Sequence, residues 1–385
     1  MALPLMFIPE QYESRYALLQ AFCREFADAA REAGLTVNPP RRGETEAAPA
    51  IFVVFNFAEH ADHILRWIGD RSGPTALVQW LVDHPFNIDK GLMTEFTKHS
   101  GFRFVHVTDD DAHLLQLRWP NLRHGRVWHG VARTALCAAQ EVESSHSDRS
   151  RDVDVFFAGS IADEAELARL LAQIPQPLHA WCDDVVRLRL EYPWLSFGQA
   201  FDVIMPSPMT CPDHWGLLAV VFRYTTAKLN RERRLRLMQG LAGLRVAVAG
   251  SPAWKDLLPA GCEYVGEVAY GDVPKWMRRS KVCVALNPTQ FVHGFSERLL
   301  LSLAGGCATV ADDRLWVREH FTNPGVRAAV GFVANAPQHM RDCVATLLAD
   351  TKARTEIAMR GRALVEKKHL WVHRVQTLLR VVGMK

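Results

Sequence analysis

One stretch, residues 282–313, constrains the fold of this chain more than any other. It holds two apolar runs, Val282–Leu286 and Cys307–Ala311, whose β-branched residues are typical of fully buried parallel strands. The leucine-rich segment between them stops at Gly305-Gly306, a common end for a helix. A strand, a helix and a second strand in this order form the repeating unit of α/β folds. We therefore predict a parallel sheet covered by helices.

Polar residues gather in this unit beyond the carboxyl ends of the predicted strands. Asn287 follows the first strand, and Asp312 follows the second. Ser296 and Glu297 place a hydroxyl and a carboxylate at the start of the helix, where the first N–H groups lack partners and carry partial positive charge. Open α/β sheets bind their ligands at this edge. The edge is therefore the first candidate binding site.

Strand and helix patterns alternate through the rest of the chain, and 385 residues are too many for one ordinary core. We predict an α/β protein with two Rossmann-like domains facing a cleft. Residues 1–145 form the first domain and residues 152–368 the second, with the polar segment 142–151 as the linker. Residues 369–385 form a helix that can cross back to the first domain. The proline-containing segment 183–213 is expected to be an irregular insertion.

Composition and charge exclude several classes of protein. Hydrophobic residues make up 49% of the chain and charged residues 23%, as in ordinary soluble domains. A formal net charge of +3 lacks the basic excess of nucleic-acid-binding proteins, and no apolar run reaches the roughly 18 residues of a spanning helix. The eight cysteines form no Cys-x-x-Cys pair, which indicates reduced thiols. We expect a cytoplasmic protein without a signal peptide that binds no nucleic acid and meets membranes at most peripherally.

The stretch that predicts the sheet also resembles a known signature. It is similar to the donor site of GT-B glycosyltransferases, in particular the glycosyl transferases group 1 set that includes the spore-maturation CgeB-like proteins. Those families show a strand ending in Leu-Asn, an Arg or Glu opening a helix, a small-x-Gly stop and a strand ending in Thr/Ser-Asp. The matching residues here are Leu286-Asn287, Glu297-Arg298, Ala304-Gly305-Gly306 and Val310-Ala311-Asp312. The closing segments Arg360-Gly-Arg362 and His369–Arg374 resemble the last helices of the same families.

The resemblance implies a GT-B glycosyltransferase that moves a sugar from a nucleotide-diphospho-sugar to an acceptor hydroxyl. A carboxylate accepts hydrogen bonds from a ribose diol, and a guanidinium pairs with phosphate oxygens; the resemblance implies these roles for Glu297 and Arg298. Because a helix N-terminus and basic side chains carry the diphosphate charge, we expect no metal and no cofactor beside the donor. The predicted donor-binding residues are Gly159, Ser160, Lys228, Arg231, Gly250, Ser251, Asn287, His293, Gly294, Phe295, Ser296, Glu297 and Arg298.

Some of these residues also have plainer interpretations. Gly159-Ser160 and Gly250-Ser251 follow predicted strands, where glycine lets backbone N–H groups approach a phosphate, but most such loops contain a glycine. Lys228 and Arg231 share a helix face at i, i+3 spacing, which also suits a solvated surface. Glu297 can simply support its own helix.

Asp83 and His84 are the predicted catalytic residues, because they end a strand of the first domain. Either side chain can take the proton of an acceptor hydroxyl; the alternative is a turn before Pro85. His129 and His293 are lesser candidates. The run Asp109–Asp111 resembles the metal-binding Asp-x-Asp of GT-A enzymes, but an acidic helix start explains it better.

The stereochemical outcome stays open. Many retaining members of these families carry glutamates at two positions that are His293 and Leu301 here. Attack assisted by His84 would be direct and inverting. A non-catalytic nucleotide-sugar binder and a GT-B-shaped epimerase or hydrolase are the alternative functions. The acceptor can be a glycan, a lipid or a protein, as in bacterial-type glycan or glycoconjugate synthesis.

Overall fold

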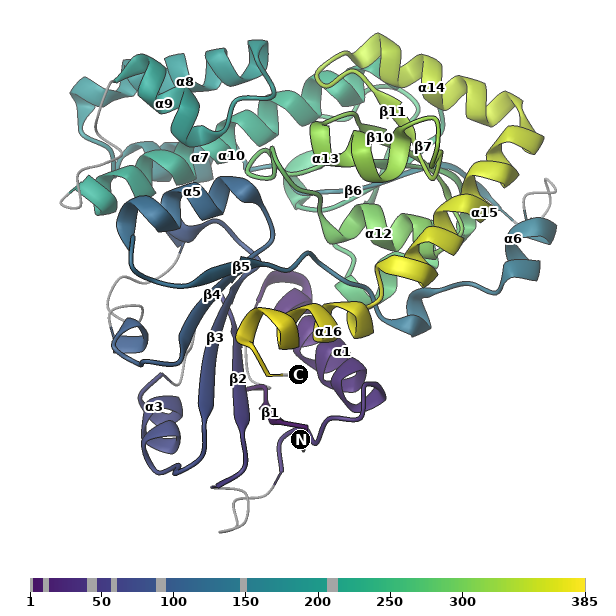
Figure 1. The fold of residues 1–385 in the computed structure, drawn as a ribbon. Helices are drawn as coiled ribbons and strands as arrows, with labels where there is room; N and C mark the ends of the chain where they lie inside the picture. The colour runs from purple at the N-terminus through teal and green to yellow at the C-terminus, as the bar shows by residue number, and fades with distance from the viewer. Residues whose placement is uncertain are drawn as a thin grey trace. The chain divides into compact units, whose positions relative to one another are not determined.

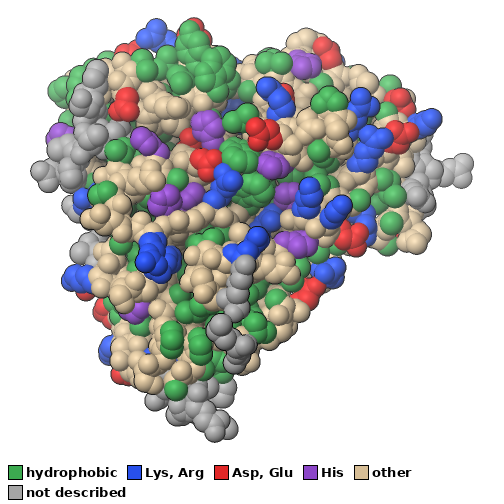
Figure 2. All heavy atoms as spheres, viewed as in Figure 1, with side chains coloured by type: hydrophobic (Ala, Val, Ile, Leu, Met, Phe, Trp, Pro, Cys, Tyr) green, Lys and Arg blue, Asp and Glu red, His purple; other side chains and the backbone are tan. Residues whose placement is uncertain are grey.

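The computed structural model describes residues 3–9, 14–39, 47–56, 61–87, 95–145, 151–205 and 214–384. The chain divides into two compact units: Met1–Ala132 with His369–Lys385, and Arg133–Lys368. Each unit is built on a parallel β-sheet of its own (Figure 1). The predicted α/β class is confirmed. Basic and acidic side chains are interspersed on the face drawn in Figure 2.

The sheet of the first unit has the order β1-β2-β3-β4-β5, and every neighbouring pair is parallel. The apolar run at Ile51–Phe55 forms its buried centre, as its β-branched and aromatic composition requires. Parallel pairing places the carboxyl ends of all strands at one edge. The strands are β1 Leu5–Phe7, β2 Ala50–Phe55, β3 Thr75–Leu81, β4 Phe102–His106 and β5 His124–Arg126.

The last helix of the chain belongs to the first unit. The indole of Trp371 is 1% exposed and lies among the rings of Phe22, Phe26, Phe55 and Trp80. Phe22 and Phe26 are four residues apart, so both point from one face of their helix. The helices of this unit are α1 Leu18–Glu32, α3 Ala61–Gly69, α5 Asp109–Arg118 and α16 Trp371–Val382.

The sheet of the second unit has the order β11-β10-β9-β6-β7-β8 and is also parallel throughout. The two runs that opened the sequence analysis form β9 and β10, which pair as neighbours. The strands are β6 Val153–Ala158, β7 Val246–Ala249, β8 Cys262–Gly266, β9 Ser280–Ala285, β10 Ala308–Asp312 and β11 Val330–Phe332.

The prediction of an irregular insertion is wrong over residues 183–204, because this part of the segment contains two helices, α8 and α9. Pro193 lies between them, and Ser196 with Gln199 forms a capping box that starts the second one. The rest of the segment lies outside the described residues. The helices of the second unit are α6 Ala139–Ser145, α7 Glu164–Leu171, α8 His179–Glu191, α9 Phe197–Ile204, α10 Trp215–Gly240, α11 Val273–Arg279, α12 Glu297–Ala304, α13 Leu315–Val317, α14 Pro337–Ala349 and α15 Thr351–Lys368.

Two further observations concern the described residues. Residues 142–145, part of the predicted linker, are helical in α6 of the second unit. Among the described helices, none has the length and apolar composition needed to cross a membrane.

Candidate functional site

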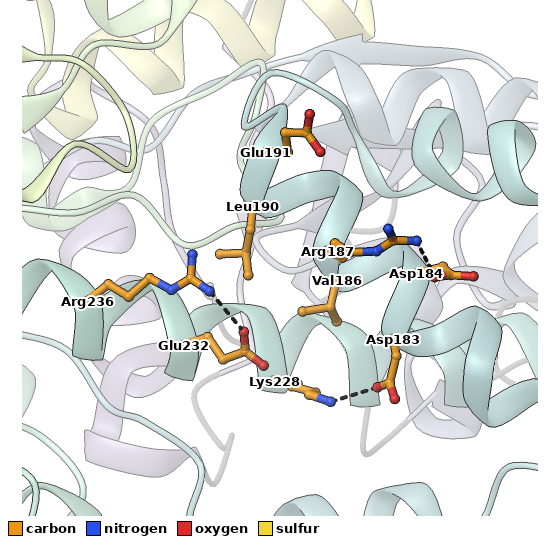
Figure 3. Close-up of a pocket in the computed structure, with 9 residues that line it drawn as sticks. All are labelled: Asp183, Asp184, Val186, Arg187, Leu190, Glu191, Lys228, Glu232 and Arg236. Carbon is orange, nitrogen blue, oxygen red and sulfur yellow. Dashed lines mark hydrogen bonds and ion pairs between the residues drawn. The ribbon is translucent and has the colours of Figure 1, made fainter.

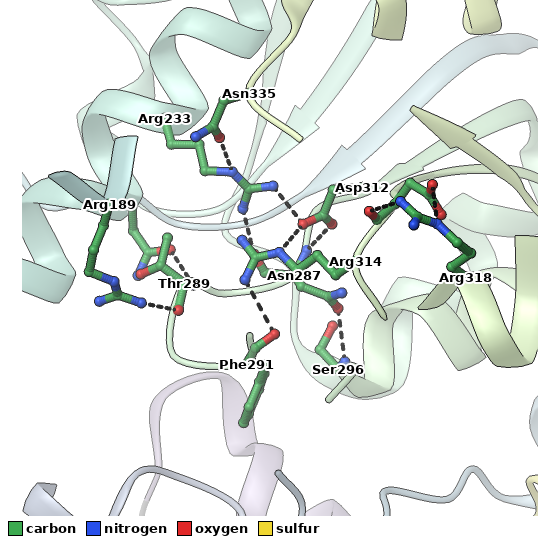
Figure 4. Close-up of polar contacts among 12 residues, drawn as sticks. Arg189, Arg233, Asn287, Thr289, Phe291, Ser296, Asp312, Arg314, Arg318 and Asn335 are labelled. Atoms are coloured by element: carbon green, nitrogen blue, oxygen red, sulfur yellow. Dashed lines mark hydrogen bonds and ion pairs between the residues drawn. The ribbon is translucent and has the colours of Figure 1, made fainter. Parts of the chain in front are cut away.

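The carboxyl edge of the second sheet is organised around Asp312, which has no exposed surface (Figure 4). Arg233 and Arg314 donate to its Oδ2 at 2.7 and 2.6 Å, and the Asn287 backbone N–H donates to Oδ1 at 2.9 Å. Burial alone would raise the pKa of Asp312, but the two guanidiniums and the N–H bond outweigh it and hold that pKa below its ordinary value. Asp312 is therefore an anion that fixes the start of the loop after β9.

Asn287 continues this network into the loop. Its Oδ1 accepts from the backbone N–H of Ser296 at 3.0 Å, so one side chain closes the segment between β9 and α12. The buried Asn287 Nδ2 and Thr289 Oγ1 have no partner among the described residues. Buried polar atoms are nearly always paired, so two unpaired ones beside a strand end suit a ligand.

The start of α12 lies beside this loop. The Ser296 side chain makes no capping bond, which differs from the sequence-based expectation. Glu297 is buried at 6% exposure, and its Oε1 lies 3.2 Å from the Nε of Arg298. Arg298 keeps a quarter of its side chain exposed and directs its NH1 to the carbonyl of Ala158, at 3.4 Å. A guanidinium thus lies over the end of β6, at the positive end of a helix.

A second buried cation, Arg234, shares this place with Arg298. Its NH1 donates to the carbonyl of Ser160, and its buried Nε has no partner within the described part of the chain. Burial first, and then the charges of Arg298 and Arg233, lower the pKa of Arg234 to about 9. Two like charges this close cost free energy unless an anion joins them, so the geometry suits a phosphate-bearing ligand.

The glycine–serine turns lie at the ends of the neighbouring strands β6 and β7. A Cβ on Gly250, whose φ is +152°, would lie 2.3 Å from the Gly159 carbonyl oxygen, so the two loops touch through backbone. The hydroxyl of Ser251 accepts from the Ile161 N–H and donates to the Ile161 carbonyl, at 3.0 and 2.6 Å. Ser251 therefore joins the two loops. Ser160 adjoins the cluster through its bond with Arg234.

Lys228 and Arg231 take separate partners. Lys228 Nζ pairs with Asp183 at 2.7 Å in a groove of about 540 Å³ that α8 and α10 line (Figure 3). Arg231 donates to the Ala162 carbonyl and to Glu164, both at 2.6 Å. The structure thus directs Lys228 to α8 and Arg231 to the loop after β6.

The loop between β9 and α12 contains His293, Gly294 and Phe295. Phe295 is 1% exposed and packs edge-on against Phe321 at 5.0 Å, so it anchors the loop in the core. Gly294 is buried, and His293 is only partly buried. His293 is therefore the side chain of this trio that a ligand can reach.

At the carboxyl edge of the first sheet, Asn56 positions Asp83. Asn56 Nδ2 donates to Asp83 Oδ2 at 3.0 Å, and its Oδ1 accepts from the N–H groups of Val82 and Asp83 at 2.9 and 3.0 Å. Its φ of +51° is unusual for a residue other than glycine. Strain held by several hydrogen bonds is often found at functional positions. The orientation of the Asp83 carboxylate is therefore fixed.

His84 is less suited than Asp83 to accept a proton. Its ring is 3% exposed, and its Nδ1 accepts from the Phe86 N–H at 3.3 Å. A neutral imidazole whose Nδ1 accepts carries its proton on Nε2. In this arrangement Nε2 is a donor.

Asp111 lies in the first turn of α5, which Thr108 caps by accepting from the Asp110 N–H at 3.0 Å. The prediction of an acidic helix start is confirmed. Asp111 has no exposed surface, and its carboxyl oxygens have no hydrogen-bond partner among the described residues. Burial, and then the carboxylates of Asp110, Asp83 and Asp109, raise its pKa well above the ordinary value. Burial and nearby carboxylates, that of Asp83 among them, therefore favour the protonated form of Asp111.

Two site features were missed by the sequence analysis. The sequence analysis did not identify Arg233 and Arg234 as site residues, and it interpreted Asp111 only as part of a helix start. The described residues contain no group of three or more His, Cys, Asp or Glu side chains arranged to hold a metal ion.

Comparison with known proteins concerns the carboxyl edge of the second sheet. Residues 231–380 match the glycosyl transferase-like family, and this segment contains Arg233, Arg234, the loop between β9 and α12, α12 itself and Asp312. No curated protein sequence matches the chain.

Solved structures extend the likeness to both units. T4 phage BGT, solved with its UDP-glucose substrate, has a TM-score of 0.54 at 9% identity, over 99% of both chains. Sucrose-phosphate synthase from Thermosynechococcus elongatus has a TM-score of 0.52 at 9% identity, also over 99% of both. HepE from Anabaena, solved with UDP and glucose, has a TM-score of 0.50 at 11% identity, over 99% of this chain and 100% of its own. The chain has the GT-B fold.

Proposed function

We propose that the protein is a glycosyltransferase that moves a sugar from a nucleotide-diphospho-sugar to an acceptor hydroxyl. The observation that carries the proposal is the placement of Arg234 and Arg298 together at the N-terminus of α12. Two guanidiniums and the partial positive charge of a helix start can bind a diphosphate and stabilise it as it leaves. The charge is met by these groups without a metal, and no further cofactor takes part.

Residues around these two arginines bind the other parts of the donor. Glu297 accepts hydrogen bonds from the ribose hydroxyls, and Asn287 Nδ2 and Thr289 Oγ1 donate to the sugar or phosphate. The exposed side of His293 contacts the donor sugar. Because T4 phage BGT and HepE are solved with UDP-glucose or UDP, a uridine nucleotide is the first donor to test.

Asp83 is the proposed general base. The acceptor oxygen forms a bond to the anomeric carbon, the bond from that carbon to the diphosphate oxygen breaks, and the acceptor proton passes to Asp83. This direct displacement inverts the anomeric configuration. Asp83 is preferred over His84 because Asn56 orients its carboxylate, whereas Nδ1 of His84 is occupied by a backbone N–H.

The site of action proposed here is the cytoplasm, and the acceptor is a glycan, lipid or protein hydroxyl. The described cysteines are all free thiols, which suits a reducing compartment. Membership of the CgeB-like subfamily stays a prediction.

The test is donor binding by thermal shift and isothermal calorimetry. UDP-, GDP-, dTDP- and CMP-sugars are compared with and without EDTA, on wild type, Arg298→Gln and Glu297→Ala. A donor at a hundred times its Kd should stabilise the protein by about 2.7 kcal/mol, and EDTA should not change this. Arg279→Gln is the matched control, since Arg279 is exposed and pairs with Asp152 on the same unit.

The outcome separates the candidate functions. Binding that Arg298→Gln abolishes and Arg279→Gln preserves supports the donor site. Release of sugar without an acceptor indicates a hydrolase, and conversion of the sugar without its release indicates an epimerase. Binding without turnover in the presence of acceptors indicates a nucleotide-sugar binder. If no nucleotide sugar binds, the proposal is wrong.

A further inference from the structure

A second basic site lies in the first unit, in a pocket of about 480 Å³. Arg103 is the second residue of β4, and Arg123 directly precedes β5. These positions are at the amino ends of the strands, so the pocket lies at the sheet edge opposite to Asp83. The other wall is the C-terminal end of α16. The lining residues are Arg103, Leu122, Arg123, His124, Arg380, Val381, Val382 and Gly383.

The arginines of this pocket have no acidic partner within the described part of the chain. Arg103 donates to the carbonyl of its neighbour Phe102 at 2.7 Å. Arg380 donates within its own helix, to the Gln376 carbonyl and the Thr377 hydroxyl at 3.4 and 3.1 Å. Burial and then the charge of Arg123 lower the pKa of Arg103. Like charges are therefore gathered here without a counter-ion.

The groove between α8 and α10 of the second unit shows how surface charges are ordinarily balanced. Its cations lie beside acids of the same groove: Lys228 with Asp183, Arg187 with Asp184, and Arg236 with Glu232. That groove needs no ligand to neutralise it, whereas the arginine pocket does.

At the base of the pocket, β5 and α16 are in close contact. The other polar groups there already have hydrogen-bond partners. A Cβ on Gly125 would lie 2.6 Å from a methyl group of Val381. The last carbonyls of α16 accept from the N–H groups of Gly383 and Met384. Both ring nitrogens of His124 contact neighbours, His106 at 3.3 Å and Gln116 at 3.1 Å. The arginines are thus the groups left to bind a ligand.

We propose that this pocket binds a phosphate group, at a site distinct from the donor site. Guanidinium forks match phosphate oxygens bidentately, and the side chains of Leu122, Val381 and Val382 provide an apolar floor beside the charge. A free phosphate and the headgroup of a phospholipid both present this chemistry. Because arginine stays protonated, binding should persist from pH 6 to 9 and weaken with salt.

The experiment uses the full chain and two probes. Inorganic phosphate is titrated by calorimetry, and binding to phosphatidylcholine vesicles with and without phosphatidic acid is measured by sedimentation. The variant Arg103→Gln/Arg123→Gln/Arg380→Gln should weaken binding of at least one probe by more than tenfold. The control, Lys228→Gln/Arg187→Gln/Arg236→Gln, removes the same charge from the α8–α10 groove and should leave binding unchanged.

Each result has a defined meaning. Binding of both probes, or of phosphate alone, supports a site for a free phosphate group, and binding only to vesicles with phosphatidic acid supports a lipid headgroup. Equal weakening by the two variants would show diffuse attraction and overturn the proposal, as would the absence of binding to both probes. If the triple variant fails to fold, the single exposed substitution Arg123→Glu must weaken binding instead. Donor binding by the Arg103→Gln/Arg123→Gln/Arg380→Gln variant should stay as in wild type.

Discussion

Two buried aspartates, Asp312 in the second unit and Asp111 in the first, show how differently the two sheet edges treat the same side chain. Neither has exposed surface. Two guanidiniums keep the pKa of Asp312 low, whereas burial and neighbouring carboxylates keep the pKa of Asp111 high. Burial is common to both, so the partners decide the charge. One edge holds an anion fixed by guanidiniums, and the other holds a carboxyl whose raised pKa favours its protonated form.

The difference assigns different chemistry to the two edges. Arg234 and Arg298 lie beyond the arginines that bind Asp312 and can stabilise the charge of a diphosphate. The Asp83 carboxylate is oriented by Asn56, and the buried Asp111 carboxyl oxygens have no hydrogen-bond partner among the described residues; both groups are suited to proton transfer. The following predictions test this division, from the largest effect to the smallest.

Asp83→Asn should cause the largest loss, because it removes the proposed base and keeps the shape of the side chain. General base catalysis contributes about 10²- to 10⁴-fold, so kcat with acceptor should fall by that factor. Donor binding should stay within about twofold of wild type. His84→Gln is the control and should retain most activity; a larger loss there than in Asp83→Asn would reverse the assignment.

Asp312→Asn should destabilise the second unit by about 3–5 kcal/mol, because removing one partner of a buried pair leaves Arg233 and Arg314 uncompensated. Urea unfolding at pH 7 measures the loss. The matched substitution Asp111→Asn replaces a buried carboxyl whose pKa is raised and whose oxygens have no hydrogen-bond partner among the described residues, so it should cost less than about 1 kcal/mol. Similar losses in both variants would contradict the contrast between the two edges.

Glu25 is a partly buried carboxyl in the first unit whose pKa is raised to about 7, by burial, although a hydrogen bond from Trp371 opposes the rise. Because its folded pKa exceeds the unfolded value, the folded state binds the proton more tightly. Stability is therefore present at low pH and is lost as pH rises from about 4.5 to 7, by at most about 3 kcal/mol. Glu25→Gln should flatten this part of the stability profile, measured by urea unfolding between pH 4.5 and 8.

The two aspartates should show opposite pH dependence. Asp111 resembles Glu25: its stabilising contribution is complete below the unfolded pKa and is lost as pH rises through the folded one. Asp312 contributes above the unfolded pKa and loses that contribution as pH falls through its lowered folded value. Unfolding profiles of Asp111→Asn and Asp312→Asn, each subtracted from wild type, should therefore slope in opposite directions.

Asp152→Asn should have the smallest effect. Its pair with Arg279 is exposed, and exposed pairs contribute at most about 1 kcal/mol. The difference should shrink further in high salt, which urea unfolding with added sodium chloride checks.

Local pattern was sufficient to predict much of the fold. The apolar runs of β9 and β10 and the glycine stop of α12 lie within one short stretch, so their pairing follows from sequence order. The helices α8 and α9 were missed because prolines were taken to break the whole segment, although Pro193 only separates two helices.

The charges of the site depend on contacts distant in sequence. Arg231, Arg233 and Arg234 are close along α10, but successive residues turn by about 100° around a helix. Whether an arginine meets Asp312, Ser160 or Glu164 depends on how α10 packs on the sheet, which no local pattern records. The raised pKa of Asp111 likewise depends on its burial and on the charge of Asp83, a residue of another strand end.

The packing of Trp371 into the first core has a consequence for the synthesis of the protein. Residues up to Ala132 emerge from the ribosome first, but their core lacks one large side chain until α16 is made. At about 5–20 residues per second, the roughly 240 residues in between take on the order of 10–50 s. During this interval the rings of Phe22, Phe26 and Trp80 lack their contact with Trp371, so chaperones should bind the nascent chain there. The second unit, whose segment is continuous, can complete its core before the first.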